Sequence, residues 1–118
     1  FLDRIINREN VVINGDGMQT RDFVFIDDIT NANVLAMGKG VSGEAYNIAS
    51  GHSHSILQLS DIISGLLGWK NKPYYRDKVA GEVSHSAADI KKAGRMMEYD
   101  PTHTLTEGLM KMVKWKFS

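Results

Sequence analysis

The sequence has 118 residues, 42% hydrophobic and 24% charged, which suits one globular domain with a core of ordinary size. Its 14 basic and 14 acidic residues give no net charge and form no block of one sign, which excludes nucleic acid as the expected main partner. The absence of cysteine removes disulfides and thiol chemistry and is compatible with a cytoplasmic protein, and no apolar run reaches the ~20 residues of a membrane helix.

Apolar periodicity predicts the elements of the first half. Residues 1–8 are expected to be the end of a helix, and the missing initial Met suggests a piece of a longer chain. The β-branched residues 11–13 are expected to form a short strand, and after a glycine-rich turn the apolar run 23–26 is expected to be a buried strand. Asp27 and Asp28 then offer the N-cap of a following helix.

The second half is expected to contain one strand, over residues 44–48, and three helices. Ser55 and Gln58 have the spacing of a capping box, and Gly68 is expected to end the helix that they begin. The remaining expected elements are an extended segment or loop at 71–80, a short helix at 89–97 and a last helix with a capping box at Thr104 and Glu107. The prediction is therefore a small, compact α/β domain of short strands and about four helices.

Two local patterns suggest cofactor chemistry but lie in the wrong context. Gly38 to Gly43 spell G-x-G-x-x-G, yet a helix is expected before them and a strand after, the reverse of a dinucleotide site. Gly38 is better explained as a helix C-cap and Gly43 as a turn residue. Tyr74 and Lys78 have the Tyr-x-x-x-Lys spacing but follow Pro73 in an expected loop. No set of histidines and carboxylates has the spacing of a metal site.

Arg21 is the candidate binding residue that local sequence indicates best. It stands between a flexible turn, with Gly15 and Gly17, and the apolar run 23–26. A guanidinium held in this way suits a bidentate contact with a phosphate or carboxylate. A surface ion pair with a neighbouring acid explains the same pattern about as well, so both interpretations stay open.

Four stretches resemble one enzyme family in the same order. GDGMQTRDFVFIDD at 15–28 resembles a segment in the second half of NAD-dependent sugar-nucleotide epimerases and dehydratases, the extended short-chain dehydrogenase/reductase family. Residues 44–51, 81–93 and 105–115 resemble that family's next strand, its "GDV-HS-AD" turn and its last helix. The resemblance covers nearly the whole chain and implies a sugar-nucleotide-binding carboxy-terminal domain over residues 1–118, most like that of nucleoside-diphosphate-sugar 4-epimerases.

The resemblance also implies what lies outside this chain. The amino-terminal Rossmann domain, which binds NAD and carries the catalytic tyrosine and lysine, would be absent, so no catalytic residue is expected here. The chain alone is expected to be inactive, and its partners would be a nucleoside-diphosphate sugar and its own Rossmann domain. The alternative is a catalytically silent interaction or regulatory domain that keeps the fold without the ligand.

The family motifs imply a role for five residues of the first half. Arg21 corresponds to the arginine that contacts the diphosphate. Val12 and Asn14 correspond to positions that flank the nucleotide base. Phe23 stands where some members have a tyrosine that contacts the ribose, and Asn47 corresponds to a strand-end asparagine near the phosphates.

A second phosphate motif, R-x-G-D, is only partly kept. Glu82 replaces its acid, which contacts the ribose, whereas Val79 stands at its arginine position. Arg76 or Lys78 could reach the same space if this loop is bulged, and the sequence does not decide between them. Val79, Asn14 and Phe23 are the departures that motivate the alternative of a silent domain.

Overall fold

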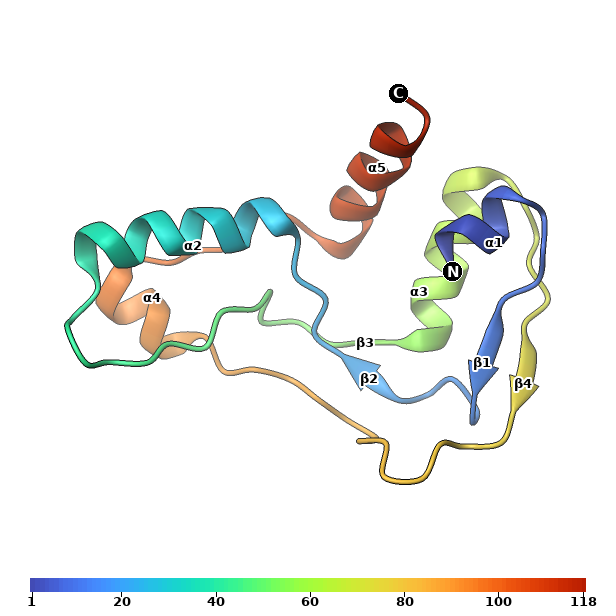
Figure 1. The fold of residues 1–118 in the computed structure, drawn as a ribbon, viewed down its shortest axis with the longest axis horizontal. Coiled ribbons are helices and arrows are strands. Elements are labelled where there is room, and N and C mark those ends of the chain that lie inside the picture. Colours follow the sequence, from blue (N-terminus) through green and yellow to red (C-terminus); the bar gives the residue numbers. More distant parts are fainter.

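The computed structural model describes residues 1–118 as an α/β unit of five helices and four short strands (Figure 1). This confirms the predicted fold class. The elements in chain order are α1 (Leu2–Ile6), β1 (Val12–Asn14), β2 (Thr20–Arg21), α2 (Ile26–Lys39), β3 (His54–Ser55), α3 (Ile56–Leu67), β4 (Tyr74–Arg76), α4 (Lys91–Met97) and α5 (Leu105–Lys116). None of these helices combines the length and apolar character that crossing a membrane requires.

The strands form two separate pairs. β1 pairs with β4 in parallel, with Asn14 opposite Arg76, and β2 pairs with β3 in antiparallel fashion. The loop around His85 makes an isolated bridge to β2 at Thr20. The Thr20 N–H donates to the Ser84 carbonyl (2.9 Å), and the Ser86 N–H donates to the Thr20 carbonyl (3.1 Å). Residues 71–80 were expected to be extended or a loop, and β4 is the extended part of that segment.

The apolar side chains form two clusters rather than one core. The first joins α1, β1, α3 and α5 through Ile5, Val11, Ile13, Ile63 and Leu109. The second joins α2 and α4 through Ala32, Ala93, Met97 and Tyr99. The chain is accordingly flat, 47 × 38 × 16 Å, and its radius of gyration of 16.4 Å exceeds the value of about 13.5 Å expected for a compact domain of this length.

The two strands predicted at 23–26 and 44–48 are not formed. α2 already begins at Ile26, and residues 23–25 and 44–48 belong to no strand. The peptide groups of residues 23–24 and 45–48 make no hydrogen bond to other backbone groups. An apolar run becomes a strand only when another strand lies beside it, and this chain places none there.

The predicted N-cap at Asp27 and Asp28 was also wrong. The N-cap of α2 is Phe25, without a side-chain hydrogen bond. Asp28 is buried and its carboxylate instead accepts hydrogen bonds from the Thr102 N–H and hydroxyl, both at 3.0 Å, and from the His103 N–H at 3.2 Å. Burial alone would raise the pKa of Asp28, but these hydrogen bonds outweigh it and hold that pKa below its ordinary value.

The predicted helix ends were right at α3. Ser55 and Gln58 form the reciprocal capping box, and Gly68 ends α3 in the left-handed conformation at φ 64°. At α2 the predicted C-cap was two residues too early, because Gly38 lies inside the helix and Gly40 is the C-cap. Gly43 is a turn residue as predicted, with φ 81°.

Candidate functional site

A polar hollow of about 400 Å³ lies between the end of β1 and the loop that follows β4. Gly15 and Gly17, at φ 77° and 78°, turn the chain sharply after β1 and so bring Gln19 back towards Asn14. The glycine turn is fixed to β4 by the Gly15 N–H, which donates to the Arg76 carbonyl at 2.8 Å. The lining residues are Asn14, Gly15, Asp16, Met18 and Gln19 on the first side and Lys78, Glu82, Val83, Ser84 and His85 on the second.

Three polar side chains meet at one edge of the hollow. The Gln19 amide donates to the Asn14 carbonyl at 2.9 Å and to Glu82 Oε1 at 3.4 Å. Arg21 Nη2 lies 3.4 Å from the same Glu82 oxygen, and its Nη1 donates to the Thr20 carbonyl at 2.6 Å. The Arg21 and Glu82 side chains are 28% and 24% exposed, so both are partly open to solvent.

Arg21 flanks the hollow rather than lining it. Of the two interpretations left open by the sequence, the ion pair with an acid is therefore observed, with Glu82 as the acid. Because the pair is only partly buried, each side chain keeps some polar surface for a further contact. A guanidinium has five donors, of which two are used here, so the ion pair does not exclude an anion.

The far wall of the hollow adds a cation and two further polar groups. The Lys78 ammonium lies 3.4 Å from the Ser84 hydroxyl. His85 Nδ1 lies 3.0 Å from the Thr20 hydroxyl, next to the point where the loop pairs with β2. Hydroxyl, carboxylate, amide and ammonium groups thus face one space of nucleotide size, and these groups suit hydroxyls and phosphates.

The other predicted residues lie apart from this hollow. Val12 is half-buried in β1 and does not line it, and Asn47 is exposed on the loop that follows α2. Arg76 lines a second, shallower hollow of about 500 Å³, which Asn14 also borders. Val79 is 51% exposed and lines neither of these two hollows.

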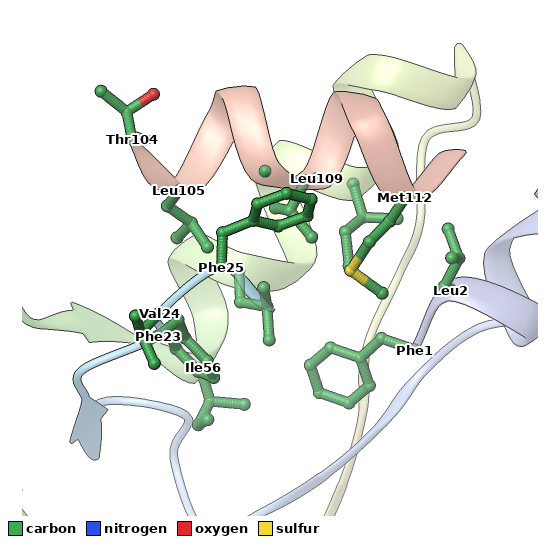
Figure 2. Close-up of a pocket in the computed structure, with 13 residues that line it drawn as sticks. Phe1, Leu2, Phe23, Val24, Phe25, Ile56, Thr104, Leu105, Leu109 and Met112 are labelled. Atoms are coloured by element: carbon green, nitrogen blue, oxygen red, sulfur yellow. The ribbon is translucent and has the colours of Figure 1, made fainter. Parts of the chain in front are cut away.

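Phe23 lines an apolar cavity of about 450 Å³ instead (Figure 2). Figure 2 shows α5 above this cavity, with Phe25 and Met112 directed into it and Phe1 below. Phe23 and Phe25 come from the segment just before α2, which forms no strand. No pattern in the sequence predicted a cavity here.

Five polar residues that line the hollow were not predicted as site residues from the sequence. Asp16, Gln19, Ser84 and His85 were not named, and Lys78 was left as an alternative to Arg76. A signal existed for Gln19, because it belongs to the 15–28 motif and immediately precedes the Thr20–Arg21 strand. Ser84 and His85 belong to the 81–93 motif, but only the pairing of their loop with β2 shows that they face the hollow. No group of three or more histidines, cysteines and carboxylates is placed to hold a metal ion.

The fold is that of the carboxy-terminal part of an extended short-chain dehydrogenase/reductase, the fold of the structures that this chain matches. Residues 1–49 match the NAD dependent epimerase/dehydratase family. The chain is a homologue of the carboxy-terminal part of that family's UDP-sugar 4-epimerases.

Three relatives illustrate the match. UDP-glucuronate 4-epimerase of Thermodesulfobacterium geofontis is 34% identical over 98% of this chain and 36% of its own length. The structure of UDP-glucose 4-epimerase from Thermotoga maritima with UDP-glucose is 34% identical with a TM-score of 0.93, over 98% of this chain and 37% of that one. UDP-glucuronic acid 4-epimerase from Bacillus cereus, with UDP-glucuronic acid and NAD, is 32% identical with a TM-score of 0.88, over 98% and 38%. The chain thus spans little more than a third of these relatives.

Proposed function

We propose that this chain is the substrate domain of an NAD-dependent sugar-nucleotide 4-epimerase, and that it binds the nucleoside-diphosphate part of the substrate in the polar hollow. The observation that carries the proposal is the meeting of Arg21, Gln19 and Glu82 at the edge of that hollow. Arg21 and Glu82 come from two motifs 61 residues apart that the family resemblance assigns to the diphosphate and the ribose. The zero cysteine content is compatible with the cytoplasmic location that belongs to this proposal.

The roles follow from the chemistry of each side chain. The Arg21 guanidinium would turn its unused donors to the diphosphate, and the Glu82 carboxylate would accept a hydrogen bond from a ribose hydroxyl. Asn14, at the open end of β1, would border the base. Relatives whose structures contain UDP-glucose, or UDP-glucuronic acid and NAD, support a UDP-sugar as the ligand class.

We further propose that the partner of this chain is its own amino-terminal Rossmann domain, which would bind NAD and supply the catalytic tyrosine and lysine. When bound, NAD would accept a hydride from the sugar and return it. The apolar cavity beneath α5 and the peptide groups at 23–24 and 46–48, which have no backbone hydrogen-bond partner, are surface of the kind that such a domain would cover. The chain spans 36–38% of its relatives, which leaves room for such a domain.

The proposal is tested by titrating the protein encoded by the complete gene with UDP in a calorimeter. We expect saturable binding that Arg21→Ala weakens by about 10-fold or more, because a charge-assisted contact is worth roughly 1.5–3 kcal/mol. A matched control is Arg95→Ala, since Arg95 is an exposed arginine on α4, the helix that packs against α2, and lines neither hollow. No binding of UDP, or equal loss in both variants, would contradict the proposal.

The silent domain remains the second candidate because Arg21 is already paired with Glu82 and because Val79 offers no charge. It predicts that the complete protein binds neither UDP nor any other nucleoside diphosphate. It also predicts that Arg21→Ala changes stability alone. Activity of the chain without its proposed partner is expected to be nil, and conversion of UDP-sugar with NAD by residues 1–118 would refute the division of labour proposed here.

A further inference from the structure

We propose that Lys78 is the second diphosphate-binding cation of this site, a role that rests on the proposed function above. It deepens that function by naming the group that completes the phosphate end of the hollow. The position follows from the structure, because Lys78 lines the same hollow as Glu82 and Asn14 while Arg76 does not.

The need for a second cation comes from the charges around the hollow. Asp16 and Glu82 both line it, and the only cation at its edge besides Lys78 is Arg21. Arg21 already shares its charge with Glu82 at 3.4 Å and with the Thr20 carbonyl at 2.6 Å. A diphosphate entering beside two carboxylates would meet net repulsion unless another positive group faced it.

Lys78 is free to supply that charge. It takes part in none of the seven ion pairs of the structure, and its ammonium makes one long contact, 3.4 Å to the Ser84 hydroxyl. An ammonium has three donors, so two or more stay available for phosphate oxygens. The neighbouring Val79 side chain has no donor at all.

The glycine turn holds the lysine stem across the hollow. A Cβ added to Gly15 would lie 3.7 Å from Lys78 Cβ and 3.8 Å from its Cγ, so the aliphatic part of Lys78 passes directly over the turn. The stem therefore starts beside the glycine turn, and its ammonium lies 3.4 Å from the Ser84 hydroxyl. The Asp16 carboxylate is bound within the turn itself, because its Oδ1 accepts a hydrogen bond from the Met18 N–H at 2.9 Å.

The two acids and the two cations would contact different parts of the ligand. Carboxylates are acceptors and suit the ribose hydroxyls, whereas Lys78 and Arg21 are donors and suit the diphosphate. Lysine acts as a point charge rather than a planar fork, so its contribution falls as salt screens it. We therefore expect the affinity for UDP to depend on Lys78, and the affinity for uridine to be independent of it.

The test measures UDP and uridine binding by calorimetry in the protein encoded by the complete gene. Lys78→Met, which keeps the stem and removes the charge, is expected to weaken UDP binding about 10-fold and to leave uridine binding unchanged. The affinity of Lys78→Arg for UDP is expected to stay within about 3-fold of that of the unmodified protein, because the substitution keeps the charge. Lys70→Met is the matched control, since Lys70 is an exposed lysine before β4 that lines neither the hollow of Lys78 nor that of Arg76.

Three results would overturn the inference. Lys78→Met with unchanged UDP affinity would show that the charge is not used, and equal loss of UDP and uridine would indicate a structural role. A larger loss from Arg76→Met than from Lys78→Met would assign the cation to the other hollow. If Arg21→Ala weakens UDP binding and Lys78→Met does not, only this inference fails, whereas an unmodified protein that binds no UDP refutes the proposed function as well.

Discussion

Replacing Asp28 by alanine removes the carboxylate that joins α2 to the loop before α5. Its oxygens accept hydrogen bonds from the Thr102 N–H, the Thr102 hydroxyl and the His103 N–H at 3.0–3.2 Å, and His103 Nδ1 lies 3.3 Å away. Hydrogen bonds to a charged group contribute roughly 1.5–3 kcal/mol each, but Thr102 is exposed and regains water when its partner is lost. We therefore expect Asp28→Ala to lower the free energy of unfolding by about 3 kcal/mol.

The matched control is the neighbouring residue. Asp27→Ala removes an equal charge, but the Asp27 side chain is 60% exposed and its one ion pair, to Lys111, is long at 3.9 Å. We expect a change within about 0.5 kcal/mol. Urea unfolding followed by far-ultraviolet circular dichroism measures both variants. Equal effects of the two substitutions would refute the argument that hydrogen bonding of the buried carboxylate is what matters.

The same carboxylate predicts a dependence on acid. Because hydrogen bonding holds the pKa of Asp28 below its ordinary value of 3.8, the ionised group stabilises the folded state above that pH. The stabilisation is lost as the pH falls through the lowered pKa of the folded state. The difference in unfolding free energy between the unmodified protein and Asp28→Asn should therefore be constant near neutral pH and shrink below about pH 4. A difference that grows in acid would contradict it.

Two further substitutions test the glycine turn and Val79. Gly17→Ala should lower the melting temperature, because Gly17 has φ 78° and an added Cβ would lie 3.3 Å from Ile13 and Leu57 atoms. Gly65→Ala in α3 is the control and should leave the melting temperature unchanged or raise it, because a Cβ there meets open space. Val79→Arg adds a guanidinium at an exposed position next to Lys78, and we expect it to tighten UDP binding several-fold at low salt and less at high salt; unchanged affinity at both would contradict this.

Elements specified by near neighbours in the chain could be predicted from sequence. The capping box of Ser55 and Gln58 and the left-handed Gly68 were correct, because each depends on residues within one turn of the helix. For residues 71–80 the sequence left an extended segment and a loop both open, and only the pairing of Tyr74–Arg76 with β1 decides for a strand there. Asp28 was misassigned for the same reason: a local cap competes with partners more than seventy residues away, and the distant partners prevail.

The candidate site was predictable only where the resemblance to a family supplied long-range information. Local spacing left Arg21 with two interpretations, and the contact with Glu82 settles which acid lies beside it. The sequence did not show that Arg76 and Lys78 line different hollows, because that depends on how β4 and the loop after it pack against β1. Phe23 illustrates the opposite case: its side chain lies in the apolar cavity, which no local pattern indicates.

The peptide groups at 23–24 and 46–48, which have no backbone hydrogen-bond partner, have a consequence for handling the protein. Open backbone edges flanked by apolar side chains are templates for pairing with a second molecule. We therefore expect residues 1–118 expressed alone to self-associate at high concentration, since a net charge of zero provides no repulsion between molecules. A charged residue introduced into either segment would act as a gatekeeper against such aggregates.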